Sequence, residues 1–138
     1  MRNYTTKHNN QMDYNLEFCN ACSNGHIEVA KWLVEICPQL DVSALYDYAF
    51  RFACTYDHIE VAKWLIHINP QINVSAQDNH AFRDACSNGH LEVAKWLVQL
   101  YPSVINISAK HECPFRGACA NGHLEVAKWL SRSSQMVG

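Results

Sequence analysis

The chain of 138 residues has only five glycines and four prolines, and it contains no long hydrophobic run. A membrane-spanning helix needs about 20 consecutive apolar residues, so we expect none. Residues 1–17 are mainly polar and lack the apolar segment of a secretory signal. We therefore expect an intracellular protein.

The sequence also lacks a dominant charge and any motif of catalysis. Its 11 Lys and Arg residues against 13 Asp and Glu residues leave a net charge of −2, which offers no general attraction to nucleic acid or to an anionic membrane. We find no G-x-S-x-G, no glycine-rich phosphate loop and no H-E-x-x-H. We expect no enzymatic activity and no cofactor, and neither nucleic acid nor membrane as a partner.

What is present is one phrase that occurs four times, each time beginning with Phe and ending with Trp. Its copies run over residues 18–32, 50–64, 82–96 and 115–129, with spacings of 32, 32 and 33 residues. A period this short indicates supersecondary units that bury their apolar faces by stacking on one another. The chain is therefore predicted to be a solenoid.

Each copy predicts two short helices. In the third, an apolar stripe at i, i+3 and i+4 predicts a first helix from about Asn79 to Asn88. Asn88-Gly89 ends it, because glycine adopts the left-handed conformation that follows many helices. A second helix is predicted over Leu91 to Leu100, apolar on more than one side, and Pro102 ends it.

The repeated words resemble the ankyrin repeat. Ala-Cys-x-Asn-Gly-His-Leu-Glu-Val-Ala-Lys-Trp-Leu is similar to the family's A-A-x-x-G-H-L-E-V-V-K-L-L, and Asn-Val-Ser-Ala to its D-V-N-A. Three residues fewer than in the family lie between Ala44 and Phe50. The resemblance implies an all-α, ankyrin-type helix-turn-helix solenoid with shortened or absent β-hairpin fingers. The spelling looks most like the arrays of giant amoeba-infecting DNA viruses (mimivirus type), which implies the cytoplasm of a host cell.

The predicted organisation follows from the copies. We expect a polar tail over residues 1–12, four repeats over 13–130 and a C-terminal tail over 131–138. The repeats divide at about 13–44, 45–76, 77–109 and 110–130.

The recurring cysteines and histidines admit a metal or redox hypothesis, which we do not favour. Equivalent residues of stacked repeats lie roughly 10 Å apart, too far for a disulfide or for one zinc site. We expect the cysteines that follow Ala to be small buried residues (Cys22, Cys54, Cys86 and Cys119). The resemblance implies a structural hydrogen-bonding role for the histidines that follow Gly or Asp (His26, His58, His90 and His123).

Two further ladders have alternative interpretations. The Trp residues could be a stacking platform for nucleic acid, but their apolar helix favours the core; they are Trp32, Trp64, Trp96 and Trp129. The Arg residues after Phe could grip an acidic partner, or could replace the family's His and tie adjacent loops together; they are Arg51, Arg83 and Arg116.

The resemblance implies a non-catalytic scaffold that binds another protein through the concave face of its first helices. The alternatives are a substrate-recruiting adaptor for host ubiquitin ligase machinery and a self-associating structural module. We expect a monomer, with end-to-end association as the alternative. The second copy, rich in aromatics, is the region to which the binding hypothesis points. The alternative is that this copy has drifted in sequence and that its aromatic residues pack against each other. The candidate partner-binding residues are Tyr46, Asp47, Arg51, Thr55, Tyr56, Asn79, Arg83, Ser87, Asn88, Glu112 and Arg116.

Overall fold

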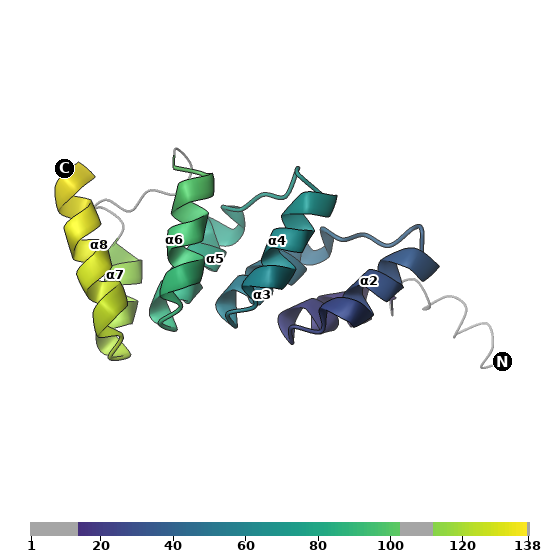
Figure 1. Ribbon diagram of the computed structural model, residues 1–138, viewed down its shortest axis with the longest axis horizontal. Helices are drawn as coiled ribbons and strands as arrows, with labels where there is room; N and C mark the ends of the chain where they lie inside the picture. Colours follow the sequence, from purple (N-terminus) through teal and green to yellow (C-terminus); the bar gives the residue numbers. More distant parts are fainter. Residues whose placement is uncertain (1–13, 103–111, 138) are drawn as a thin grey trace. The chain divides into compact units, whose positions relative to one another are not determined.

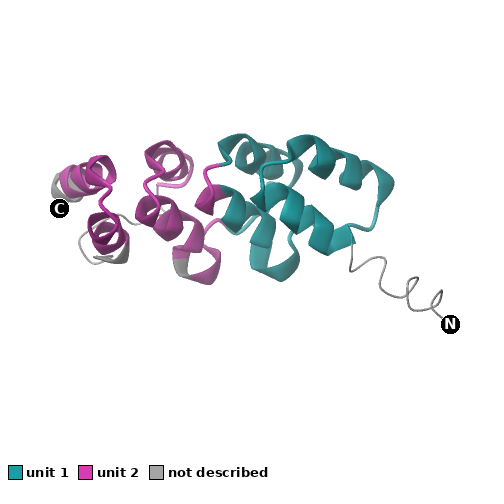
Figure 2. Ribbon diagram, turned by 90° about the horizontal axis from the view of Figure 1, so that it is seen from below, with its two compact units in different colours: residues 1–53, 58–73 teal, residues 54–57, 74–138 magenta. Residues whose placement is uncertain are grey.

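The computed structural model describes residues 14–102 and 112–137, which form two compact units. The first unit contains Met1–Ala53 and His58–Asn73, and the second contains Cys54–Asp57 and Val74–Gly138. Figure 2 shows the two units in different colours. Each unit holds two of the sequence repeats, except that residues 54–57 of the second repeat are grouped with the second unit.

The first unit contains a helix at residues 14–23, α2 (Ile27–Ile36), α3 (Ala44–Thr55, whose last two residues fall in the second unit) and α4 (Ile59–Ile68). The second contains α5 (Ala76–Ser87), α6 (Leu91–Leu100), α7 (Glu112–Ala120) and α8 (Leu124–Val137). In this second unit α5 packs on α7, and each packs on the second helix of its own repeat (Figure 1).

Neither part of the chain that the structure describes contains a strand. The repeats therefore have no β-hairpin finger there, and the predicted all-α helix-turn-helix solenoid is confirmed. None of the described helices is both long enough and apolar enough to cross a membrane.

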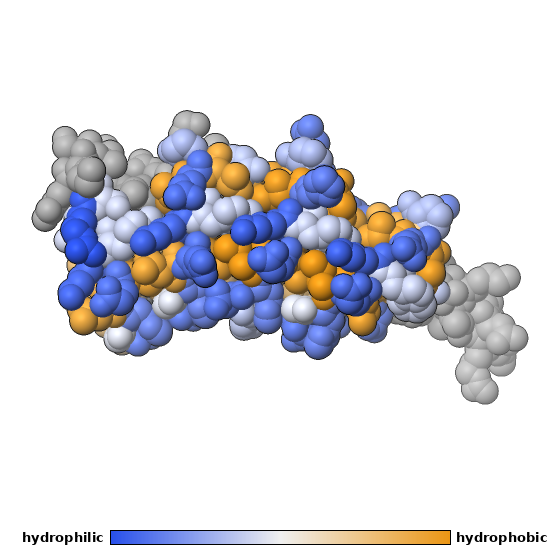
Figure 3. All heavy atoms as spheres, viewed as in Figure 1, coloured by the Kyte–Doolittle hydropathy of each residue, from blue (hydrophilic) through white to orange (hydrophobic). Residues whose placement is uncertain are grey.

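The second helix of the third repeat begins and ends where the sequence predicts. Gly89 has φ +80°, and α6 then covers Leu91–Leu100 as expected. Its Val93, Ala94 and Leu97 are buried, while Glu92 and Lys95 are exposed. Along the second helices, hydrophilic and hydrophobic residues are interleaved on the face drawn in Figure 3. Such a pattern is typical of a helix that packs against neighbours on two sides and is exposed to solvent on its remaining side.

The first helices begin with an unexpected left-handed turn. Leu45, Tyr46 and Asp47 have φ of 58°, 56° and 60°, and Gln77 and Asn79, at the same repeat positions, have 57° and 59°. The right-handed helix therefore starts near the predicted Asn79, although α5 as a whole begins at Ala76. The shortened connection leaves few residues in which to reverse the chain, and this turn takes the place of the finger.

Helix α8 extends further than its equivalents. Residues 131–137, assigned from sequence to a C-terminal tail, continue this helix to Val137. The reason is local, because no proline follows Leu130, whereas Pro38, Pro70 and Pro102 follow the earlier second helices.

The prediction that the tryptophans are buried in the core was wrong for Trp32, which is exposed, and the other three are only partly buried. Trp32 is 54% exposed, and Trp64, Trp96 and Trp129 are half-buried. Within each unit, an indole packs against the Phe of the preceding repeat: Phe18–Trp64 at 6.2 Å and Phe82–Trp129 at 6.3 Å between ring centroids. Trp32 of the first repeat has no such ring contact among the described residues.

The prediction that the cysteines after Ala are buried is confirmed at three positions and is wrong at the fourth. Cys22, Cys54 and Cys86 are fully buried, but Cys119 is exposed. In the second unit, α7 packs on α5, the helix that holds Cys86, while α7 itself, which holds Cys119, packs on α5 and α8.

Candidate functional site

The left-handed turn of the second repeat presents two large side chains to solvent. Leu45 is 59% exposed and Tyr46 is 73% exposed. Arg51 holds their backbone: its Nε donates to Tyr46 O and its Nη2 to Leu45 O, each at 2.9 Å. The guanidinium is nearly buried, with 8% of Arg51 exposed. We call these two residues the Leu45–Tyr46 turn.

Asp47, the third residue with positive φ in this turn, is buried and binds the backbone of the chain that follows α4. It is 7% exposed, and its Oδ2 accepts a hydrogen bond from Asn73 N–H at 3.2 Å. Asn15, one repeat earlier, accepts from Asp41 N–H at 2.9 Å in the same way. Burial raises the pKa of Asp47 above its usual value, and the bond from Asn73 opposes this. Its Oδ1 is buried without a hydrogen-bond partner among the described residues.

The remaining aromatic residues of this repeat pack on one another. Tyr48 and Phe52 lie 4.2 Å apart between ring centroids, with 30° between their planes. The Cζ of Arg51 lies 5.4 Å from the Phe52 centroid and 5.9 Å from that of Tyr48. These cation–π contacts hold Arg51 where it binds the turn. Tyr46 and Leu45 are therefore the apolar side chains of the turn left to meet a partner.

The third repeat has the same turn with polar residues. Arg83 Nη2 donates to Gln77 O at 3.1 Å, as Arg51 does to Leu45 O. Asn79 occupies the slot of Asp47, and its Oδ1 is buried without a partner in residues 14–102 and 112–137. Both arginines thus bind the backbone of the turn that begins their own helix.

In the second unit, Tyr56 interrupts a ladder of asparagines. Asn88 Nδ2 donates to Thr55 O at 3.1 Å, and Asn121 Nδ2 donates to Ser87 O at 2.8 Å. Each bond joins the ends of the first helices in successive repeats. Tyr56 holds the same slot without an amide to donate, and it is 54% exposed.

Aspartate also replaces glycine in this repeat. Asp57 has φ +68°, and its carboxylate lies 3.8 Å from Nδ1 of His90 in the next repeat. Where glycine is kept, the histidine ring of the next repeat packs directly on it: a Cβ at Gly25 or Gly89 would clash with His58 or His123. The side chains of His26, His58 and His90 make no hydrogen bond that caps their helices. Packing on the preceding repeat is the observed structural role of His58 and His123.

The candidate binding residues fall into three groups. Tyr46, Tyr56, Asn88 and Arg116 are exposed, Asn79, Arg83 and Ser87 are half-buried, and Asp47, Arg51 and Thr55 are buried. Thr55 Oγ1 donates to Asp84 Oδ2 at 3.3 Å. The side chain of Glu112 lies outside the described part of the chain. Leu45 was missed, because a Leu beside Ala reads as part of a return to the next helix.

Thiol or metal chemistry finds no support in the environment of the Cys19-x-x-Cys22 pair. Burial raises the pKa of Cys19 to about 11 and that of Cys22 to about 12, so neither thiol ionises readily at neutral pH. Among the described residues, no three His, Cys, Asp or Glu side chains gather as metal ligands would.

The comparisons with known proteins agree with the helix pairs. The family profile described as ankyrin repeats (3 copies) matches residues 50–137, more than half of the chain. No curated protein matches the chain. With paired helices, a repeated glycine turn and this match, the chain belongs to the ankyrin repeat family.

Proposed function

We propose that this chain is a non-catalytic scaffold that binds another protein through the Leu45–Tyr46 turn of its second repeat. Ankyrin repeats generally mediate protein–protein interaction. The observation that carries the proposal is the exposure of Leu45 and Tyr46 on a turn whose backbone is held by Arg51 and Asp47. An unsupported left-handed turn of non-glycine residues would cost about 1–2 kcal/mol per residue, so it persists because its surroundings hold it.

The turn has the properties of an interface anchor. Tyrosine is enriched among the residues that contribute most to binding. A turn that is already held in one conformation loses little entropy when a partner docks. The equivalent turn of the third repeat offers Gln77 in place of Leu45, so the two turns present different chemistry on the same backbone. This difference supports specificity for the second repeat.

Affinity capture with matched variants tests the proposal. We would immobilise the chain, Tyr46→Ala and the control Gln77→Ala, and quantify the captured proteins from the producing cell by mass spectrometry. We expect a protein captured by the chain and by Gln77→Ala but depleted at least tenfold with Tyr46→Ala. Equal capture by all three would contradict a role for the turn, provided that circular dichroism shows all three folded.

The exposed residues of the second unit are secondary candidates. Tyr56→Asn restores the side chain found at positions 88 and 121, so this variant separates a binding role from a structural one. Loss of the captured protein with unchanged melting temperature would support a contact at Tyr56. The spelling of the repeats further leads us to propose a viral array that acts in host cytoplasm, which immunofluorescence of the producing cell would test.

A further inference from the structure

The contact between the two repeats of a unit has two halves. Inside each unit, the Trp of one repeat lies against the Phe of the repeat before it, in the pairs Phe18–Trp64 and Phe82–Trp129. A histidine ring of the later repeat likewise covers the glycine of the earlier one, in the pairs Gly25–His58 and Gly89–His123. The same two contacts thus recur in both units.

The fourth repeat presents the uncovered glycine-and-phenylalanine half. Phe115 is 43% exposed, whereas Phe18, Phe50 and Phe82 are at most 1% exposed. Among the described residues, no atom lies within 4 Å of the position that a Cβ would take at Gly122. We call the surface formed by Phe115, Gly122 and Ala127 the acceptor face.

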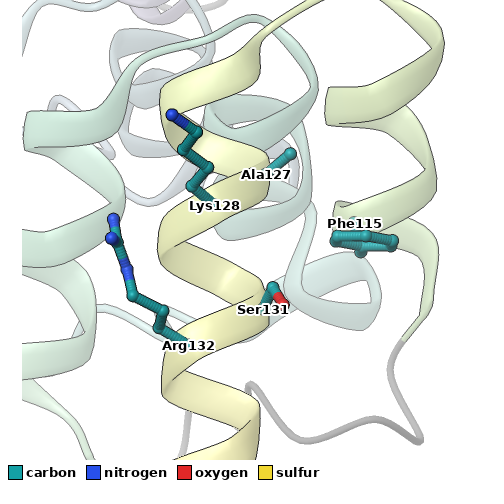
Figure 4. A pocket seen from close by; sticks show the side chains of 5 residues that line it. All are labelled: Phe115, Ala127, Lys128, Ser131 and Arg132. Atoms are coloured by element: carbon teal, nitrogen blue, oxygen red, sulfur yellow. The ribbon is translucent and has the colours of Figure 1, made fainter.

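The acceptor face contains a shallow hollow of about 440 Å³ between α7 and α8. Ala127 and Ser131 of α8 point toward Phe115 of α7 (Figure 4), while Lys128 and Arg132 complete the lining from the other side of α8. An aromatic ring suits this hollow, because Phe115 offers an apolar wall.

The first repeat presents the uncovered tryptophan-and-histidine half. Trp32 is 54% exposed, and Val29, one turn before it on α2, is 47% exposed. The residues equivalent to Val29 are at most 2% exposed in the later repeats (Val61, Val93 and Val126). His26 is exposed, whereas its later equivalents are half-buried. We call the surface formed by His26, Val29 and Trp32 the donor face.

We propose that the acceptor face binds the donor face of a second copy of this chain. Trp32 of one copy occupies the hollow beside Phe115 of the other, and His26 covers Gly122. The contact continues the interface already built between repeats in each unit, with the same residue types in the same slots. Because the two faces differ, the association is head-to-tail rather than the isologous contact of a two-fold dimer.

Sedimentation velocity of the purified chain tests this directly. We expect the weight-average mass to rise from that of the monomer to beyond that of the dimer between about 10 µM and 1 mM, the range of a weak interface of this kind. A monomer mass throughout this range would overturn the proposal.

Two variants, each with one face removed, test the orientation. Trp32→Ala removes the donor indole, and Ala127→Glu fills the hollow with a charged side chain. Each alone should remain monomeric, and an equimolar mixture should form a dimer that grows no further, because each variant keeps the face that the other lacks. Association of either variant alone, or a mixture that remains monomeric, would contradict a head-to-tail contact.

Tyr46→Ala is the matched control, since Tyr46 is exposed but belongs to neither face. It should associate as the unaltered chain does, and loss of association in this variant would contradict the assignment of the faces. Circular dichroism and melting temperature should be unchanged in Trp32→Ala and Tyr46→Ala. The result is separate from the proposed partner-binding role, which depends on Tyr46 and not on Trp32.

Discussion

At the scale of single residues, glycine at the end of a first helix has two separate reasons. Gly89 and Gly122 both have positive φ, of 80° and 79°, which any L side chain adopts at a cost. Only Gly89 also lies beneath a histidine ring, that of His123. The two positions therefore separate backbone strain from close packing.

We expect Gly122→Ala to lower the free energy of unfolding by about 1–2 kcal/mol, the cost of a left-handed alanine. Gly89→Ala should cost about 1–3 kcal/mol more, because the added methyl group displaces the His123 ring. Urea denaturation at low micromolar concentration, below the expected association, measures both. Equal losses would show that the ring moves aside freely.

The buried carboxyl group of Asp47 makes a pH-dependent prediction. Burial raises its pKa in the folded state, so ionisation opposes folding, and this cost is present above the folded pKa and vanishes below the ordinary value of 3.8. Asn keeps an acceptor for Asn73 N–H and already occupies this slot at Asn15. Asp47→Asn should therefore be more stable at pH 7, by about 0.5–1 kcal/mol.

Denaturation of Asp47→Asn and the unaltered chain at pH 7 and at pH 4 measures the difference. The advantage of Asn should shrink at the lower pH, because the Asp47 carboxyl group becomes protonated there. A variant that is less stable at pH 7 would show instead that the ionised carboxylate contributes to the turn.

At the scale of elements, the second helices were predictable and the entrance to the first helices was not. Leu91–Leu100 follows from its apolar pattern between Gly89 and Pro102, and α6 has these bounds. The shortened connection before Phe50 indicated a missing finger, but counting residues does not reveal the backbone path. Consecutive left-handed residues are unfavourable locally, and in the second repeat the hydrogen bonds of Arg51 and Asp47 hold them in place.

The tryptophans show the same limit. Identical motifs predict identical environments, yet Trp32 and Trp64 differ in exposure. Trp64 packs against Phe18 of the preceding repeat, and Trp32 has no such contact among the described residues. We expect Trp64→Ala to lower the free energy of unfolding by about 2–4 kcal/mol, and Trp32→Ala by less than about 1 kcal/mol. Thermal or urea denaturation of both variants checks this pair. Similar losses would mean that Trp32 is packed after all.

At the scale of the whole molecule, the repeated sequence predicts the scaffold but does not show which copies of a residue are exposed. Phe115 and Cys119 belong to the repeated motif, so the sequence predicts that they are buried, yet both are exposed in the second unit. Tyr46 was a candidate as part of the aromatic-rich second copy, Asp47 because its position varies between copies, and Arg51 as part of the Arg ladder, yet Asp47 and Arg51 are buried. Variation between repeats therefore indicates where to look, and exposure decides which side chains can meet a partner.

Calorimetric titration of the captured partner tests the central claim, that the Leu45–Tyr46 turn is the anchor of a protein-binding site. We expect Tyr46→Ala to raise the dissociation constant by about 30-fold, which is the effect typical of a hot-spot residue. Gln77→Ala should change the dissociation constant by less than about threefold. An unchanged affinity in a folded Tyr46→Ala variant would contradict the central claim.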